Sequence, residues 1–142
     1  MKFNNIKVGS TISKYATIST NAITSSGLIA MPGVIINSGC IIGENVFINT
    51  GCIVEHDCII EDNVFLLPGV ILSGSVSVKQ NSFVGSGAII STGLEIGENV
   101  TVGAGSVVVK NIPDSVTIFG NPAHKNMISK MISGKKYYNT WR

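Results

Sequence analysis

His56 stands between two carboxylates, in the order Glu55-His56-Asp57. Neutral imidazole accepts a proton near neutral pH, and a neighbouring carboxylate can orient the ring and raise its basicity. Such a group can act as the general base when a hydroxyl or an amine attacks an activated carbonyl. His124 is the only other histidine, and it lies in a basic segment without acids. His56 is therefore the candidate base, against the alternative of an ordinary exposed histidine, and either neighbouring acid could orient it.

A metal centre is not expected from the remaining candidate ligands. Cys40, Cys52 and Cys58 are separated by 12 and 6 residues, which matches no zinc-binding pattern, and three cysteines cannot all pair within one chain. Two histidines are too few for a three-histidine metal site. We expect reduced thiols that pack as small core residues, and the alternative of a catalytic thiol is disfavoured.

A six-residue repeat, opened at Ile6, runs to Pro113 without insertion or deletion, which gives 18 hexads. The first position is Ile, Leu or Val in 16 of the 18 hexads, and the fifth is small or aliphatic and includes all three cysteines. The fourth position is Gly or Asn in 15 hexads, as expected for a corner that needs a positive φ. Each hexad therefore predicts one short strand and one corner.

Three hexads are expected to close one triangular coil, so the repeat predicts a parallel β-helix of about six coils. At a spacing of about 4.8 Å between coils, the prism is roughly 29 Å long. The first and fifth positions point inward, so the sixth must point outward because side chains alternate along a strand. That outward position is apolar in 12 of 18 hexads and includes Phe47, Phe65 and Phe83. A ladder of three phenylalanines exceeds what a monomer usually exposes, so we expect an oligomer.

The frame ends at Pro113, which suggests a repeat domain over residues 1–123 and a basic cap or tail over residues 124–142. Residues 114–123 are expected to form a cap at the open end of the prism. In residues 127–132, Met and Ile recur at helical spacing, which predicts a short helix that completes the cap. The alternative, a basic helix bound to a membrane surface, is disfavoured because its apolar face is so short.

Charge and composition exclude several classes of protein. Residues 1–123 carry five Lys against eight acids, whereas residues 124–142 carry four Lys and one Arg without an acid. A nucleic-acid-binding face would need basic residues interleaved with aromatics, and the acidic body lacks one. No apolar run is long enough to cross a membrane, and the start lacks the apolar segment of a signal peptide. We expect a soluble cytoplasmic protein that binds no nucleic acid.

The sequence resembles the hexapeptide-repeat acyltransferases, whose fold is a left-handed β-helix. Hexads in which an aliphatic residue precedes Gly, such as Ile42-Gly43 and Val84-Gly85, carry this resemblance. Within that superfamily, the sequence is similar to the sialic acid O-acetyltransferases and bacillosamine-type sugar N-acetyltransferases over about residues 6–124. The motifs that carry the similarity are Asn49-Thr50-Gly51-Cys52-Ile53-Val54-Glu55-His56-Asp57-Cys58, Leu67-Pro68-Gly69-Val70 and Gly120-Asn121-Pro122-Ala123. The resemblance implies acetyl-CoA as donor and a homotrimer with active sites between neighbouring subunits.

The resemblance also implies roles for particular residues. His56 would be the general base, and Asp57 would orient it, with Glu55 as the rival carboxylate. Phe65, Gly74, Ser86 and Ala104 match positions along the acetyl-CoA site of the family. Family members often carry a histidine at the position of Phe65, so this chain departs from them there. Lys110 and Lys125 are further candidates, for contact with the cofactor phosphates. The simpler interpretation is that both are solvent-exposed charges without a ligand.

We therefore expect an acetyl-CoA-dependent transferase that acetylates a sugar hydroxyl or amine in surface glycan synthesis. The family usually carries an N-terminal α/β domain that holds a nucleotide-linked sugar, whereas here the first hexad begins at Ile6. The acceptor site would then be missing, supplied by a separate chain, or formed in the groove between subunits. The alternative function is a non-catalytic trimeric scaffold or a degenerate fragment, and acetyl-CoA binding distinguishes the two.

Overall fold

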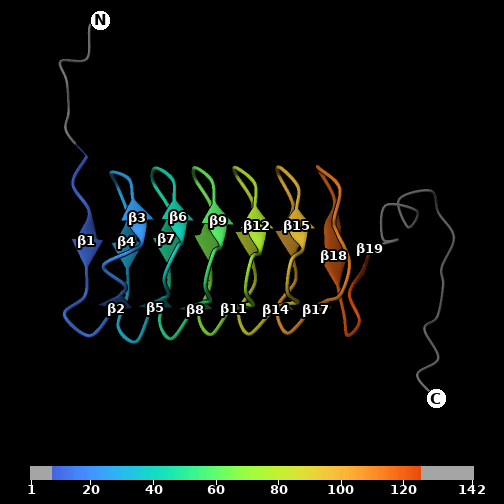
Figure 1. Ribbon diagram of the computed structural model, residues 1–142. Helices are drawn as coiled ribbons and strands as arrows, with labels where there is room; N and C mark the ends of the chain where they lie inside the picture. Colours follow the sequence, from blue (N-terminus) through green and yellow to red (C-terminus); the bar gives the residue numbers. More distant parts are fainter. Residues whose placement is uncertain (1–7, 126–142) are drawn as a thin grey trace, which may run out of the picture.

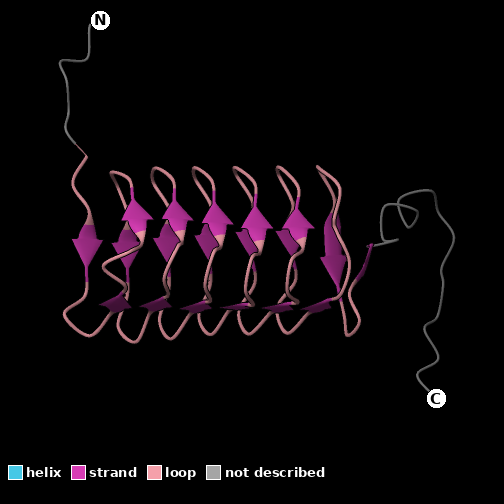
Figure 2. Ribbon diagram, in the orientation of Figure 1, coloured by secondary structure: helices cyan, strands magenta, loops and turns pink. Residues whose placement is uncertain are grey.

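A computed structural model describes residues 8–125 and shows an all-β prism of stacked coils (Figures 1 and 2). The chain passes through three faces in turn and returns after three hexads to a strand parallel to the one it left. This architecture is a left-handed parallel β-helix of about six coils, so the fold expected from the hexads is confirmed.

Three sheets form the faces of the prism, and we call them the first, second and third sheet. The first sheet has the strand order β1 (Thr11–Ile12), β4 (Ile29–Ala30), β7 (Phe47–Ile48), β10 (Phe65–Leu66), β13 (Phe83–Val84), β16 (Thr101–Val102), β18 (Thr117–Phe119) and β19 (His124–Lys125). The second has the order β17 (Val107–Val108), β14 (Ile89–Ile90), β11 (Ile71–Leu72), β8 (Ile53–Val54), β5 (Ile35–Ile36) and β2 (Thr17–Ile18). The third has the order β15 (Glu95–Ile96), β12 (Ser77–Val78), β9 (Ile59–Ile60), β6 (Ile41–Ile42) and β3 (Ile23–Thr24).

Strands β1 to β17 coincide with the sixth and first positions of the hexads. Phe65 pairs with Phe83 on one side and with Phe47 on the other, so the outward phenylalanines form a ladder on the first sheet. Backbone N–H groups of one coil donate to carbonyls of the next, as from Phe65 to Ser82 at 3.0 Å. Residues three hexads apart are therefore stacked neighbours, and this spacing governs the placement of every side chain in the prism.

The inward columns form one continuous core along the prism axis. From residue 28 to residue 108, every first and fifth hexad position is buried except Leu94, which is half-buried. The two buried polar side chains of this part are Ser82 and Ser106, and the Ser82 hydroxyl donates to the Gly97 carbonyl at 2.7 Å. In the first described coil the core is open, because the inward side chain of Ile12 is 48% exposed.

The corners take the backbone conformation that the fourth hexad position predicts. At every such position from residue 27 to residue 105, φ is positive. Asn fills several of these positions, and its short polar side chain tolerates the left-handed region better than other non-glycine residues do. Asn63 also links its stacked neighbours, because its amide donates to Asn81 at 3.2 Å and accepts from Asn45 at 3.4 Å.

The repeat ends with a change of register. Ile96 pairs with Ile112, and Val102 pairs with Ile118, so the last stacked pairs are two positions closer along the chain than the pairs before them. The segment expected as a cap over residues 114–123 includes β18, which continues the first sheet, and β19 then turns back antiparallel to β18. Ile112 and Ile118 are buried beneath this end. The helix expected over residues 127–132 lies outside the described residues.

No helix among residues 8–125 is long and apolar enough to span a membrane.

The three cysteines are expected to resist thiol reagents in the folded protein. All three are free and buried in the core, and their thiols donate to the carbonyls of Glu55, Leu67 and Ser73 in the following coil. Burial raises the pKa of each thiol, that of Cys58 from 9.0 to about 11. A chromogenic disulfide reagent should find no reactive thiol at neutral pH and three after denaturation, and rapid reaction of the native protein would contradict this burial.

The same shift predicts how stability depends on pH in the alkaline range. The unfolded chain releases the Cys58 proton above about pH 9, whereas the folded chain retains it up to about pH 11. Between these two pH values the unfolded state binds fewer protons than the folded state. The free energy of unfolding, which is highest below pH 9 as far as Cys58 is concerned, should therefore decline as the pH rises toward about 11. Denaturant unfolding at pH 8 and pH 10.5 should show a smaller decline for Cys58→Ala than for the parent.

Candidate active site

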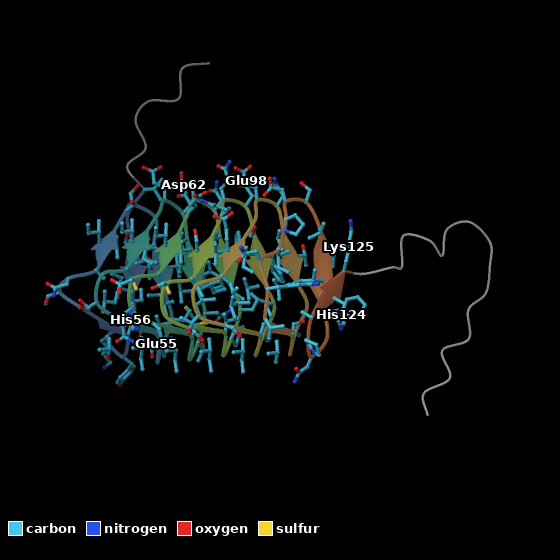
Figure 3. All side chains as sticks on the ribbon, turned by 45° about the vertical axis from the view of Figure 1, so that its right-hand side comes forward. Glu55, His56, Asp62, Glu98, His124 and Lys125 are labelled. Carbon is cyan, nitrogen blue, oxygen red and sulfur yellow. The ribbon has the colours of Figure 1, made fainter. Side chains whose placement is uncertain are left out.

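His56 lies on the corner between β8 of the second sheet and β9 of the third, and we call this edge the His56 corner. Its side chain projects from the prism and is 61% exposed (Figure 3). The backbone there is held from both sides, since Asp57 donates its N–H to the Ser38 carbonyl at 3.0 Å and Ser75 donates to the His56 carbonyl at 2.8 Å. The coils before and after it therefore fix the position from which the imidazole projects.

Asp57 is the carboxylate that contacts the ring. Its Oδ2 lies 2.9 Å from His56 Nδ1. An ionised carboxylate only accepts hydrogen bonds, so neutral His56 carries its proton on Nδ1 and keeps the Nε2 lone pair free. Asp57 has a φ of 60°, so the residue also serves the left-handed corner. The two interpretations of Asp57 that the sequence allows, a turn former and a partner of the histidine, are thus compatible.

Glu55, the rival carboxylate, is engaged elsewhere. Its Oε2 accepts a hydrogen bond of 3.0 Å from the Asn37 side-chain amide, one coil earlier in the same column. The contact between Asn37 and Glu55 is the part of this corner that sequence reasoning missed. A signal for it existed, because an amide three hexads before a carboxylate is its stacked neighbour in this repeat. Asp57 is therefore the neighbouring acid whose side chain contacts His56.

Gly74 is the stacked neighbour of His56 on the following coil. A Cβ atom built on Gly74 would lie 2.6 Å from both Cε1 and Nε2 of the imidazole. The edge of the ring that bears Nε2 therefore lies directly beside the glycine.

The remaining residues expected at the site lie elsewhere on the chain. Ser86 and Ala104 are stacked at the corner between the first and second sheets, which we call the Ser86 corner, and Gly105 donates its N–H to the Ser86 carbonyl at 2.8 Å. Phe65 projects from the first sheet and is 44% exposed, with its ring in an edge contact with Phe47 at a centroid distance of 6.1 Å. The second sheet separates the Ser86 corner from the His56 corner. One chain therefore does not bring all the expected residues together.

The basic candidates are also separated from His56. Lys110 follows Gly74 two coils later in the same column, and Lys125 lies on β19. His124 lies beside it, toward the opposite end of the prism from His56 (Figure 3). Among residues 8–125 no group of three or more His, Cys, Asp or Glu is placed to hold a metal ion.

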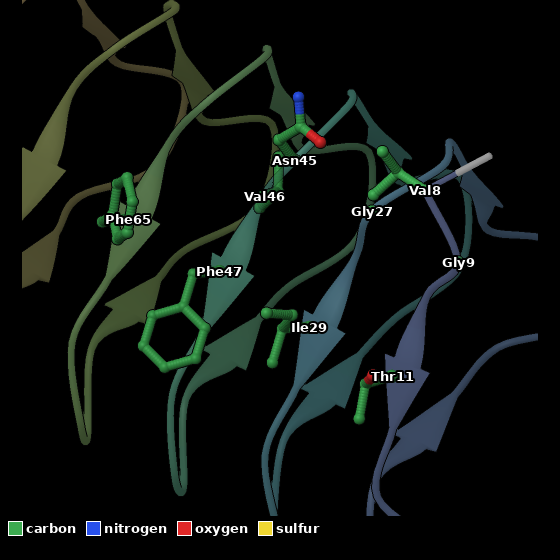
Figure 4. Close-up of a pocket in the computed structure, with 9 residues that line it drawn as sticks. All are labelled: Val8, Gly9, Thr11, Gly27, Ile29, Asn45, Val46, Phe47 and Phe65. Carbon is green, nitrogen blue, oxygen red and sulfur yellow. The ribbon is translucent and has the colours of Figure 1, made fainter. Parts of the chain in front are cut away.

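A shallow apolar groove of about 470 Å³ lies over the N-terminal half of the first sheet (Figure 4). Its lining includes Ile29, Phe47 and Phe65 but none of the residues of the His56 corner. The residues that line the groove include no acid and no base.

Comparison with known proteins identifies the family to which this prism belongs. The bacterial transferase hexapeptide family (six repeats) matches residues 39–74 and 75–110, together half of the chain. The chain therefore belongs to this family. A match of the periviscerokinin family covers only residues 24–34, less than one coil, and shows no relationship. The search of curated proteins finds no significant match.

Several solved structures share the fold at substantial identity. A variant of perosamine N-acetyltransferase from Caulobacter crescentus, in complex with CoA and GDP-perosamine, is 38% identical with a TM-score of 0.84, over 84% of this chain and 57% of that one. The acetyltransferase domain of PglB from Neisseria gonorrhoeae, in complex with acetyl coenzyme A, is 36% identical with a TM-score of 0.83, over 84% and 58%. WeeI from Acinetobacter baumannii is 32% identical with a TM-score of 0.79, over 81% and 57%.

The chain thus spans somewhat more than half the length of the structures it matches. The resemblance to sugar N-acetyltransferases of the hexapeptide superfamily, expected from the sequence motifs, is confirmed by these matches.

The Asp57–His56 contact predicts the tautomer of the imidazole. Nitrogen NMR of the neutral ring should place the proton of His56 on Nδ1, whereas an exposed imidazole in water prefers Nε2. Asp57→Asn should shift His56 toward the Nε2–H form, because an amide can donate to Nδ1, and should leave the turn intact because Asn occupies the same corner position at 45, 63, 81 and 99. His124 provides the internal reference. An unchanged tautomer in the variant would mean that Asp57 does not orient the ring.

Proposed function

We propose that this chain is an acetyl-CoA-dependent acetyltransferase that transfers the acetyl group to an amine or hydroxyl of a sugar. The observation that carries the proposal is the His56–Asp57 pair at 2.9 Å, with Nε2 unblocked on an exposed corner of a hexapeptide prism. The CoA and GDP-perosamine bound to the Caulobacter enzyme support acetyl-CoA as donor and a sugar nucleotide as acceptor.

In the proposed reaction the acceptor nitrogen or oxygen attacks the thioester carbonyl of acetyl-CoA. His56 Nε2 takes the proton from the attacking group, so that a neutral amide or ester forms as the carbon–sulfur bond breaks. The proton on the imidazolium then passes to the CoA thiolate, which leaves as the thiol and restores the base. Asp57 keeps Nδ1–H in place and stabilises the imidazolium between these two transfers.

A complete site requires a second copy of the chain. The donor residues proposed from the family, Ser86 and Ala104 with Phe65, lie away from the His56 corner on the same chain, so a neighbour must supply one half. We assign Phe65, Ser86 and Ala104 to the acetyl-CoA site and propose a homotrimer with active sites between subunits. Gly74, which the family resemblance places along the same site, lies beside the imidazole of His56. The acceptor would bind in that intersubunit groove or on a separate chain.

The apolar faces support a particular interface for this trimer. On the third sheet, Ile23, Ile41 and Ile59 are 64%, 46% and 43% exposed, and they lie on the same coils as Ile29, Phe47 and Phe65 of the first sheet. Parallel neighbours related by a three-fold axis present equal coil levels to one another, so these stripes match in height. Burying the first sheet of one subunit against the third sheet of the next also brings the His56 corner toward a neighbouring chain.

The proposed setting of the reaction is the cytoplasm, where three unpaired core thiols are typical, and its product would enter surface glycan synthesis. A non-catalytic scaffold is the alternative. Failure of the purified trimer to bind acetyl-CoA would favour the scaffold over the enzyme.

Removal of the base should abolish most of the activity without unfolding the prism. His56→Ala is expected to lower the rate of acetyl transfer by about 10² to 10⁴, because a positioned general base contributes that factor. The assay follows CoA release with an amino- or hydroxy-sugar nucleotide as acceptor. His124→Ala is the matched control, since it removes the other histidine and should retain parental turnover. If His56→Ala turns over at the parental rate, the base lies elsewhere.

Three substitutions on a single coil distinguish the possible interfaces. Phe47→Asp on the first sheet and Ile59→Asp on the third should each dissociate the trimer, because a carboxylate buried without a partner is costly. Ile53→Asp on the second sheet should leave the trimer intact. Sedimentation compares each variant with the chain mass of 14.9 kDa and its threefold multiple. A monomeric parent protein would refute the trimer, and dissociation by Ile53→Asp would assign the interface to the second sheet.

A further inference from the structure

Gly74 has no explanation in the backbone of its own corner. It is the only glycine at the third position of any hexad, and the same column carries side chains at Ser38 and Thr92. Gly74 is also absent from the positions of positive φ, which within the repeat fall at the fourth hexad positions from residue 27 to residue 105. A side chain at residue 74 would therefore meet no conformational penalty from the turn.

The neighbour that a side chain at residue 74 would displace is His56. The three atoms nearest to a Cβ built on Gly74 are Cε1 and Nε2 at 2.6 Å and Cδ2 at 3.3 Å, all in the imidazole. Two of these distances are shorter than any ordinary van der Waals contact. By contrast, a Cβ built on Gly85 would meet backbone atoms of the next coil. Gly74 thus leaves space for one ring, and the ring occupies it.

We infer that Gly74 is a positioning residue for His56, because the missing side chain creates the seat on which the imidazole lies. The ring is then held from two directions. Asp57 holds Nδ1 at 2.9 Å, and the Gly74 surface supports the opposite part of the ring, which bears Nε2. A methyl group at residue 74 would displace the nitrogen that accepts the proton and would rotate Nδ1 away from Asp57. The effect on rate rests on the proposed function, whereas the effect on the ring does not.

This role differs from a passage for the cofactor, which the family resemblance assigns to the same glycine. If Gly74 served only to admit acetyl-CoA, a methyl group there would weaken acetyl-CoA binding and would act equally with or without the imidazole. If Gly74 seats His56, the methyl group lowers turnover through the ring, and its effect disappears once the imidazole has been removed. The two roles therefore separate in a double-mutant cycle.

The experiment compares the parent, Gly74→Ala, His56→Ala and the double variant. Carbon-detected NMR of the two histidine Cε1–H groups reports the ring directly, and His56→Ala assigns the His56 signal. In Gly74→Ala we expect a shifted His56 signal, an unchanged His124 signal and a turnover number at least about tenfold lower, within the range a general base controls. Acetyl-CoA affinity by calorimetry should stay within about threefold of the parent. Thr92→Ala, in the same column, is the control and should change none of these.

Each contrary result has a definite meaning. An unchanged His56 signal in folded Gly74→Ala would overturn the inference, and a tenfold loss of acetyl-CoA affinity with that unchanged signal would assign the glycine to the cofactor instead. Misfolding of Gly74→Ala in both His56 backgrounds would assign the glycine to the backbone and also overturn the inference. A shifted His56 signal in a protein that neither binds nor transfers acetyl groups would support the seat while refuting the proposed enzyme.

Discussion

Stacking of the chain on itself every three hexads is the constraint on which the rest of this structure depends. Backbone hydrogen bonds between coils fix the register, and short strands with left-handed corners keep each face in line with the one before. Any side chain then has two neighbours that belong to the same column. This is why the core is a set of continuous apolar columns, and why His56 lies beside Gly74, which is 18 residues further along the chain. Neither the columns nor this proximity follows from the residues adjacent in sequence.

The regularity also explains how much the sequence could predict. Burial and strand positions follow from hexad position, and the identity of the column neighbours follows from counting, so the core, the faces and the His56–Gly74 proximity are open to prediction. The direction of a side chain at a corner cannot be predicted in this way, because it depends on the rotamer, and several hydrogen-bonding partners compete to set that rotamer. Asp57 contacts the ring, whereas Glu55 instead accepts a hydrogen bond from Asn37 at 3.0 Å, and the repeat alone does not predict this difference. The register change near Ile112 likewise follows from packing beyond the repeat.

The chemistry of the prism is divided between its edges. The His56 corner carries an imidazole in contact with a carboxylate, whereas the Ser86 corner carries small side chains, and the second sheet lies between them. For the acetyl transfer proposed here, this separation favours a site that is complete only in an oligomer. The Caulobacter and Neisseria structures, at 38% and 36% identity, hold their ligands on proteins that share this fold.

The return of the chain at β19 has a consequence for solubility. A stack of parallel coils has no intrinsic end, since each terminal coil offers the same hydrogen-bonding groups that joined the coils before it, and such an edge can recruit another molecule. At the C-terminal end the first sheet finishes in a short antiparallel strand that carries the exposed charge of Lys125. Short, charged and reversed in direction, this strand is a poor template for a further parallel coil. On the first sheet, the C-terminal edge is therefore poorly suited to pair with another molecule.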